Sequence, residues 1–225
     1  VDLRDYEQTR KFIEKHLPID GIINLAANVG GLFKNLRCPV EMTEDNILIN
    51  LNVLRVAHKY NINRVVCCLS TCIFPDVPPD SPMNASMIHY GPPHYSNQGY
   101  AYAKRITDTL CKAYRDEYKR EYFCVVPTNV YGCFDHFDDV ENSHVIPALI
   151  NKFTSSKEKV VIKGDGTPKR QFIYSEDLAN LILWAFENYT DIETPLILCP
   201  PNSEISIKYA VEVISKECGF KGDIE

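Results

Sequence analysis

The sequence predicts an α/β fold in which helices cover both faces of a parallel sheet, a doubly wound arrangement. Four short apolar runs rich in β-branched residues are continuous rather than alternating, which is typical of strands buried on both faces. Segments with the apolar spacing of amphipathic helices lie between these runs, and this alternation of strand and helix favours a parallel sheet. With 225 residues, of which 45% are hydrophobic, the chain is long enough for one large domain with a substantial core.

The predicted elements follow one another along the chain. Strands are expected at residues 22–25, 65–69, 123–126 and 196–198. Helices are expected at residues 6–17, 40–60, 99–118, 144–153, 175–189 and 206–218. Ser175 and Ser206 stand where the last two helices begin, and a serine there supplies the side-chain oxygen that caps a helix N-terminus.

Two segments are expected to be irregular. Residues 71–98 hold six of the 14 prolines, which excludes a long helix and favours an ordered loop. Loops of this length without secondary structure are usually functional. Residues 131–141 are acidic and aromatic without periodicity, and together with the helix expected after them they predict a smaller cap over the sheet.

The start of the chain predicts an N-terminal truncation. A nucleotide-binding sheet normally opens with a strand, a glycine-rich turn and a helix, and no G-x-G-x-x-G pattern occurs here. Residues 1–3 read as the end of a strand that leads directly into a helix, so we expect about one and a half βα units to precede them.

Charge, hydropathy and cysteine usage exclude several classes of protein. The net charge is −6 and no run of lysine and arginine is long enough to track a phosphate backbone, so nucleic acid is not an expected partner. The longest apolar runs, 65–69 and 181–186, fall far short of the roughly 18 residues of a membrane span. The first residues lack the profile of a signal peptide, which predicts a cytoplasmic protein.

The nine cysteines favour reduced thiols over disulfides or a metal site. Their number is odd, they are spread along the chain, and several lie inside apolar runs such as 65–69. No two of them have the C-x2-C spacing of a zinc site, so no metal is expected.

Three polar clusters follow predicted strands. Residues 28–31 come after the first strand, Ser70, Thr71 and Cys72 after the second, and Thr128 with Asn129 after the third. In open α/β sheets ligands bind beyond the carboxyl ends of the strands. These clusters therefore predict a ligand site at one sheet edge, although ordinary turn chemistry would use the same residue types.

Tyr100 and Lys104 form a possible proton-donating pair. They are four residues apart in a predicted helix, so they share a face. A phenol titrates near pH 10, and a unit charge at about 4 Å with an effective dielectric of about 20 is worth roughly 4 kcal/mol. We therefore expect Lys104 to lower the pKa of Tyr100 by up to about three units. The phenol could then donate a proton to a ketone oxygen as hydride arrives, and Ser70 at a strand end strengthens this interpretation.

At this point the sequence resembles the extended short-chain dehydrogenase/reductases, whose Ser or Thr and Tyr-x-x-x-Lys residues are matched by Ser70, Tyr100 and Lys104. Within that family the resemblance is to the GDP-L-fucose synthases, and it runs through nearly the whole chain. The segments that carry it are LAANVGG at 25–31, LSTCIFP at 69–75, PTNVYG at 127–132, SHVIP at 143–147 and GTPKRQF at 166–172. The most specific elements are Cys72, two residues after the serine, and the His144 segment.

The resemblance implies an activity and roles for five residues. The substrate would be GDP-4-keto-6-deoxy-D-mannose, whose C3 and C5 protons are made acidic by the C4 ketone. Cys72 and His144 would exchange these protons as base and acid, in an order left open, because their free pKa values near 8.5 and 6.5 lie close to working pH. NADPH would then reduce C4, with Tyr100 protonating the oxygen, Lys104 lowering the pKa of Tyr100 and holding the nicotinamide ribose, and Ser70 bound to the carbonyl.

The resemblance also implies binding residues and a division of the chain. NADP contacts would come from Asp2, Ala26, Ala27, Cys68, Leu69, Ser70, Thr71, Tyr100, Lys104, Pro127, Thr128, Asn129, Val130 and His144. Substrate contacts would come from Asn129, Lys152, Lys163 and Arg170. Residues 1–132 would form a partial Rossmann-like NADP-binding domain, and residues 133–225 mainly the substrate-binding part, with segments near 171–189 returning to the Rossmann sheet.

Some residues depart from the family pattern. Residues 133–137 stand where the family usually has a proline and an Asp-Asn-Phe, and Lys163 stands where some members have a tryptophan against the base. Cys72 could otherwise be one more small buried residue, His144 a helix-capping residue, and Arg170 a solvated charge. Family members commonly form homodimers, and the long helices from Val40 and Gly99 are candidates for a helix-bundle contact.

Two other functions stay open at this stage. Another extended reductase or epimerase acting on a nucleotide sugar would not need Cys72 or His144. A non-catalytic remnant could keep the sheet and a sugar-nucleotide pocket for binding alone.

Overall fold

The computed structural model describes residues 1–138, 143–201 and 203–225. Its longer elements are α1 (Tyr6–Lys15), β1 (Gly21–Asn24), α2 (Leu32–Arg37), α3 (Pro39–Lys59), β2 (Arg64–Cys68), α4 (Gln98–Tyr118), β3 (Glu121–Pro127), α5 (Val145–Ser155), α6 (Ser175–Asn188), β7 (Leu196–Leu198) and α7 (Ile207–Glu217). The shorter strands are β4 (Asn129–Tyr131), β5 (Lys159–Val160), β6 (Lys169–Tyr174), β8 (Glu204–Ser206) and β9 (Asp223–Ile224). Within these residues no helix is long and apolar enough to cross a membrane.

The predicted parallel sheet is confirmed. Its four strands lie in the order β1-β2-β3-β7, and each neighbouring pair is parallel. The apolar runs account for this, because β2 and β3 are buried over most of their length and present side chains to both faces. The sequence therefore identified every strand of this sheet within about two residues of its bounds.

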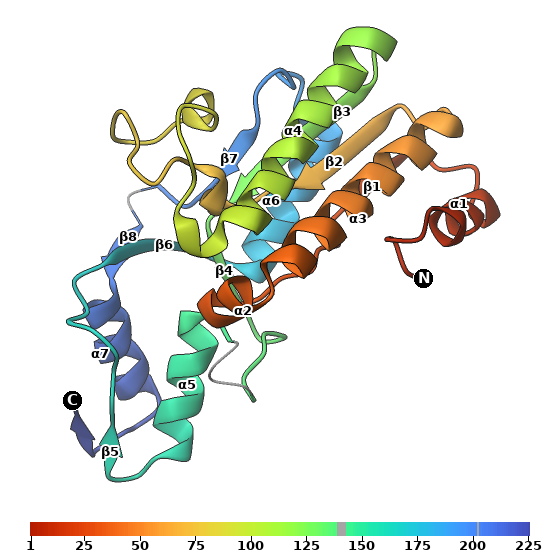
Figure 1. The fold of residues 1–225 in the computed structure, drawn as a ribbon. Coiled ribbons are helices and arrows are strands. Elements are labelled where there is room, and N and C mark those ends of the chain that lie inside the picture. The colour runs from red at the N-terminus through yellow and green to blue at the C-terminus, as the bar shows by residue number, and fades with distance from the viewer. Residues whose placement is uncertain (139–142, 202) are drawn as a thin grey trace.

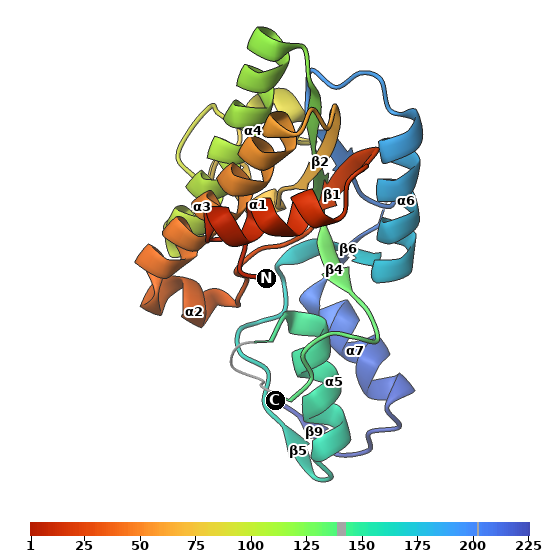
Figure 2. The ribbon, with the colours of Figure 1, turned by 90° about the vertical axis from the view of Figure 1, so that its right-hand side faces the viewer.

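Helices cover both faces of the sheet, as predicted. Helices α1, α3 and α4 lie on one face and α6 lies on the other (Figures 1 and 2). Val65, Cys67 and Cys124 belong to the core shared with α3 and α4, whereas Val66 and Phe123 pack with α6. Alternate residues of a strand point to opposite faces, which is why consecutive residues of β2 enter different cores.

The C-terminal half forms a smaller cap beside the sheet. Helices α5 and α7 pack together through Leu149, Phe153 and Val211, and lie below the sheet in Figures 1 and 2. A second sheet of order β4-β6-β8 lies between the cap and the main sheet, and α6 follows β6 back onto the main sheet. Residues 139–141 of the irregular stretch predicted at 131–141 lie outside the described residues.

Helix capping follows the prediction at one of the two serines. Ser206 precedes α7 and its hydroxyl accepts a hydrogen bond from the Tyr209 backbone N–H at 3.1 Å. Ser175 instead is the first residue of α6, and the N-cap residue Tyr174 makes no side-chain cap bond. Glu176 and Asp177 in the first turn still suit the positive end of the helix dipole.

The proline-rich segment 71–98 is the expected loop. It contains three short 3₁₀ turns, η1 (Thr71–Ile73), η2 (Ala85–Met87) and η3 (Tyr95–Asn97), and then leads into α4. Met87 and Ile88 are buried in the same core as β2. The loop is thus anchored to the body of the molecule by its own apolar side chains.

Candidate active site

The strand ends bring the predicted polar residues to one sheet edge. Because β1, β2 and β3 are parallel, their carboxyl ends meet at the same edge. Ser70 follows β2 by two residues and Thr128 follows β3 directly. The N-terminal turn of α4, which carries Tyr100, approaches the same edge through the contact of α4 with η1.

Ser70 and Cys72 are held in one tight turn. Ser70 is the N-cap of η1, and its Oγ accepts a hydrogen bond from the Cys72 backbone N–H at 3.5 Å. Burial raises the pKa of the Cys72 thiol to about 11, while the hydroxyl of Ser70 and the charge of Lys104 act in the opposite direction. The predicted neighbours Ser70 and Cys72 are therefore brought together.

Lys104 is a buried cation that contacts the last residue of β2. Only 2% of this residue is exposed, and its Nζ donates a hydrogen bond to the carbonyl oxygen of Cys68 at 2.8 Å. Nζ also lies 5.6 Å from the centroid of the Tyr100 ring. Burial lowers the pKa of Lys104, because desolvation disfavours the ammonium form. An ammonium has three donors, so this contact leaves capacity for a ligand at the same edge.

The predicted lowering of the Tyr100 pKa is wrong for the structure as it stands. Burial raises the pKa of Tyr100 above its usual value near 10, and the neighbouring thiols Cys72 and Cys68 add to the increase. Helical spacing did bring Lys104 beside the ring, but its Nζ is directed at the Cys68 carbonyl. Desolvation of the phenolate is the largest cause of the increase, so the phenol is held in its proton-donating form.

A cavity of about 430 Å³ opens beside β1. Three predicted cofactor residues, Asp2, Ala26 and Ala27, line it together with Leu3 and Ile49. This volume is within the range of small-molecule sites. The small side chains of Ala26 and Ala27 leave the backbone after β1 open to a ligand.

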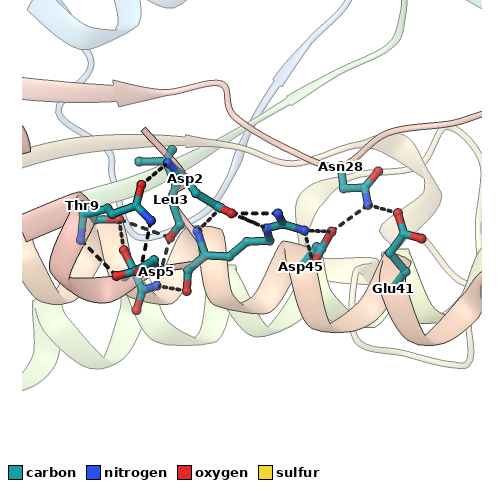
Figure 3. A network of polar contacts seen from close by, with 10 residues as sticks. Asp2, Leu3, Asp5, Thr9, Asn28, Glu41 and Asp45 are labelled. Atoms are coloured by element: carbon teal, nitrogen blue, oxygen red, sulfur yellow. Dashed lines mark hydrogen bonds and ion pairs between the residues drawn. The ribbon is translucent and has the colours of Figure 1, made fainter.

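Asp2 belongs to a polar network at the mouth of this cavity (Figure 3). The Arg4 guanidinium donates to both carboxylate oxygens of Asp2, at 2.9 Å and 2.7 Å, and lowers the pKa of Asp2 to about 2. Arg4 also bonds Asp45, which accepts a hydrogen bond from Asn28. The network links the start of the chain to α3 and to the loop after β1.

A ladder of asparagines fixes that loop, and the sequence analysis did not single it out. Asn24 donates to Asn50 at 2.9 Å, and the Asn24 side-chain oxygen accepts from the Ala26 N–H at 3.2 Å. Asn46 donates to the Asn28 carbonyl at 2.9 Å and accepts from its N–H at 3.1 Å. Asn46 and Asn50 are four apart on α3, and this buried i,i+4 pair of amides is the signal that could have revealed them.

The end of β3 contributes a second group of predicted cofactor residues. Pro127 ends β3, and the Thr128 N–H donates to the Leu198 carbonyl at 3.2 Å. The Thr128 hydroxyl oxygen is buried and has no hydrogen-bond partner within the described chain. Asn129 bonds the Gln171 carbonyl at 2.9 Å, and Val130 lies in β4. The unpaired hydroxyl, the cavity beside β1 and the spare donors of Lys104 are compatible with a dinucleotide bound along this sheet edge.

The remaining predicted residues lie in or beside the cap. His144 is exposed at the N-cap of α5, and no contact within the described residues joins its side chain to Cys72 or Tyr100. Lys152 donates to the Val161 carbonyl at 2.9 Å, and Lys163 lies 5.2 Å from the centroid of the Phe33 ring on α2. Arg170 is exposed and bonds only the preceding carbonyl among the described contacts. In residues 1–138, 143–201 and 203–225, no group of three or more His, Cys, Asp or Glu side chains is suited to hold a metal ion.

Comparison with known proteins identifies the family. The NAD dependent epimerase/dehydratase family matches residues 1–198. The chain is similar to the GDP-L-fucose synthase of Dictyostelium discoideum, with 44% identity across 99% of this chain and 70% of that protein. The probable GDP-L-fucose synthase of Drosophila melanogaster is 39% identical across 99% of this chain and 71% of that protein.

A solved structure gives the same result. The GDP-L-fucose synthetase of Naegleria fowleri bound to NADP superposes with a TM-score of 0.91 and 38% identity, across 100% of this chain and 69% of that one. The fold, the cofactor class of the family and the near-complete coverage agree with the resemblance drawn from the motifs. The chain therefore belongs to the NAD dependent epimerase/dehydratase family and, within it, to the GDP-L-fucose synthases.

Proposed function

We propose that this chain carries the activity of a GDP-L-fucose synthase: epimerisation of GDP-4-keto-6-deoxy-D-mannose at C3 and C5, then NADPH-dependent reduction of the C4 ketone. The supporting observation is the gathering of Ser70, Cys72, Tyr100 and Lys104 at the carboxyl end of β2. A hydroxyl, a protonated phenol and a buried cation suit the reduction of a ketone, and a thiol suits proton exchange at an acidic C–H beside it.

The reduction step uses the phenol and its neighbours. NADPH, when bound, supplies the hydride. Tyr100 donates its proton to the C4 oxygen, and burial favours this role because it keeps the phenol protonated. Ser70 donates a hydrogen bond to the same oxygen, and the positive charge of Lys104 stabilises the negative charge left on Tyr100.

The epimerisation step needs an acid and a base on opposite faces of the sugar. We assign these roles to Cys72 and His144, in an order that stays open. Cys72 sits in the η1 turn beside Ser70, and His144 stands exposed at the N-terminus of α5. Each proton removed from C3 or C5 must be returned from the other face, so both groups are required for inversion.

Cofactor and substrate would occupy the sheet edge and the cap. Asp2, Ala26 and Ala27 line the cavity proposed for the adenosine side of NADP, and Thr128 with Lys104 lies on the nicotinamide side. Lys152, Lys163 and Arg170 supply positive charge on the cap side, where a GDP diphosphate needs charge-assisted hydrogen bonds. Asn129 joins them from β4.

Assembly and compartment follow from the same proposal. Tyr102 and Ile106 are each 40% exposed on one face of α4, and Leu48 is 39% exposed on the neighbouring α3. An exposed apolar face on two adjacent helices supports a homodimer built as a helix bundle. All nine cysteines are free thiols, which suits the reducing cytoplasm.

The test is an isotope experiment with the protein encoded by the complete gene. It is incubated with GDP-4-keto-6-deoxy-D-mannose and NADPH in heavy water, and the molecular mass of the product is measured. Two deuterium atoms, at C3 and C5 of a reduced sugar, are expected. Reduction without exchange would indicate a simple nucleotide-sugar ketoreductase, and neither reaction would indicate a binding protein.

A further inference from the structure

Arg105, the residue after Lys104 on α4, is a buried cation to which the proposed reaction gives no role. Only 6% of it is exposed. Its Nε donates to the Ile73 carbonyl and its Nη1 to the Gly91 carbonyl, both at 2.7 Å. Its Nη2 is buried and has no hydrogen-bond partner within the described chain. Burying this charge costs free energy, and the two hydrogen bonds to backbone carbonyls offset part of that cost.

These two carbonyls lie at opposite ends of the proline-rich loop. Ile73 is the last residue of η1 and follows Cys72 directly, whereas Gly91 lies at the far end of the loop. The Asp76 N–H donates to the Pro92 carbonyl at 3.0 Å and closes the base of the loop. One guanidinium thus joins both ends of the loop to α4 and fixes the turn that carries Cys72.

Arg105 also places charge beside the thiol. Cys72 interacts electrostatically with Ser70 in the same turn and with Lys104 and Arg105 on α4, and it raises the pKa of Tyr100 on the same helix. Two of them, Lys104 and Arg105, are permanent or near-permanent cations, and both oppose the increase that burial imposes on the Cys72 pKa. Of the two cations, Arg105 is the one that bonds the residue next to Cys72 among the described contacts, whereas Lys104 bonds the Cys68 carbonyl.

We infer that Arg105 is a positioning residue for the acid–base chemistry of Cys72, because it fixes the η1 turn and holds a positive charge beside the thiol. The inference rests on the proposed function in one respect, namely that Cys72 exchanges protons with the keto sugar. The geometry separates two contributions, the planar fork that binds two carbonyls and the charge itself. Arg105→Lys removes the fork and keeps the charge, whereas Arg105→Gln removes both.

Arg115 offers a matched control on the same helix. It is also 6% exposed, donates to the backbone carbonyls of Tyr122 and Glu193, and has one buried nitrogen, Nε, without a partner in the described structure. It lies near the other end of α4 from Cys72. Arg115→Lys therefore removes a buried guanidinium that binds two carbonyls, but at a site away from the thiol. Thermal unfolding of every variant measures how much stability each substitution costs.

The first readout is deuterium exchange at C3 and C5 of the keto sugar in heavy water, with NADP⁺ in place of NADPH so that no hydride is transferred. We expect exchange to fall about tenfold in Arg105→Lys and about a hundredfold in Arg105→Gln, since a displacement of about 1 Å at a reacting group can cost that much. Arg115→Lys should exchange within about twofold of the wild type.

The second readout needs no substrate. The rate at which iodoacetamide alkylates Cys72 at pH 8 is followed by peptide mass spectrometry. Both Arg105 variants loosen the turn, but only Arg105→Gln loses the charge, so Arg105→Lys should react at least about threefold faster than Arg105→Gln. Equal alkylation rates in the two variants would overturn the inference.

The two readouts separate the inference from the proposed function. If the wild type exchanges deuterium and both Arg105 variants exchange at the same rate as Arg115→Lys, the positioning role is wrong. If the wild type exchanges none, the proposed function is wrong, and the alkylation rates alone decide the role of Arg105. If Arg105→Gln does not fold, the comparison of Arg105→Lys with Arg115→Lys decides it through exchange.

Discussion

At the scale of single residues, the state of Tyr100 is decided by burial rather than by its charged neighbour. Lys104 shares its helix face, yet the pKa of Tyr100 is raised because the phenolate would be desolvated. A phenol that stays protonated at neutral pH is well suited to give up a proton only when an oxyanion forms beside it. The buried ammonium then stabilises the resulting phenolate, which is a charge that develops during the reaction.

Tyr100→Phe tests this role directly. The substitution keeps the ring and removes the proton donor, so reduction of the keto sugar should slow about 10²- to 10⁴-fold. Deuterium exchange at C3 and C5 should persist, because Cys72 and His144 are untouched. Tyr102→Phe, two residues along the same helix and 40% exposed, is the control and should reduce at the wild-type rate. A Tyr100→Phe enzyme that reduces normally would mean that another group supplies the proton.

At the scale of elements, the local signals predicted the main sheet and most helices, whereas the second sheet was missed. Strands β2 and β3 are buried apolar runs, and β1 and β7 are short, partly buried ones, so the sequence pattern alone indicates all four. Strand β6 begins with exposed charged residues and exists because β4 and β8 pair with it on either side. No property of residues 169–174 alone indicates that pairing.

The same distinction holds for the candidate site. Ser70 and Lys104 were predicted because strand ends and i,i+4 spacing are sequence rules. Arg105 was not singled out, because its partners are backbone carbonyls that only the folded chain brings close. The direction of the Tyr100 pKa was predicted wrongly, since spacing gives proximity to a charge but not the extent of desolvation.

The asparagine ladder on α3 gives a prediction for an element. Asn46→Leu would leave the Asn28 backbone groups without their buried partner, and we expect the free energy of unfolding to fall by about 2 kcal/mol. NADP binding should weaken as well, because the loop after β1 carries Ala26 and Ala27. Urea unfolding and titration calorimetry with NADP measure the two effects.

Asn188→Leu is the control for that experiment. Asn46 also donates to the Met42 carbonyl at 2.8 Å, four residues earlier. Asn188 makes the same type of i−4 side-chain bond, to the Trp184 carbonyl at 3.0 Å, but it is exposed at the end of α6. Its substitution should change the unfolding free energy by less than about 0.5 kcal/mol. If both substitutions lower the free energy of unfolding equally, the asparagine ladder stabilises the protein no more than an exposed helical asparagine does.

At the scale of the whole molecule, the buried thiols make stability depend on alkaline pH. A hydrogen bond with Cys111, together with burial, holds the pKa of Cys67 well above its usual value, and the pKa of Cys124 is also raised. The unfolded chain then loses thiol protons above about pH 8.5 while the folded chain keeps them, so stability is complete below that pH and falls as pH rises. Urea midpoints at pH 7.5, 8.5 and 9.5 should decrease in that order.

Two cysteine variants locate the cause of this pH dependence. Cys67→Ala removes one buried thiol and should flatten the decline between pH 8.5 and 9.5, even though the cavity lowers stability at every pH. Cys133→Ala removes an exposed thiol and should leave the slope unchanged. A slope that is the same in both variants would assign the pH dependence to groups other than the buried thiols.

Assembly is the last property of the whole molecule that the structure allows to be tested. The outer face of α4 presents Tyr102 and Ile106, while the opposite side of the sheet presents Leu183 on α6, which is 51% exposed. Ile106→Glu places a charge in the proposed helix-bundle contact, where burying it without a partner would cost several kcal/mol, so the protein should sediment as a monomer. Leu183→Glu changes an exposed leucine on the other face and should leave a dimer intact. The proposed interface is wrong if the wild type sediments as a monomer, or if Leu183→Glu dissociates the dimer and Ile106→Glu does not.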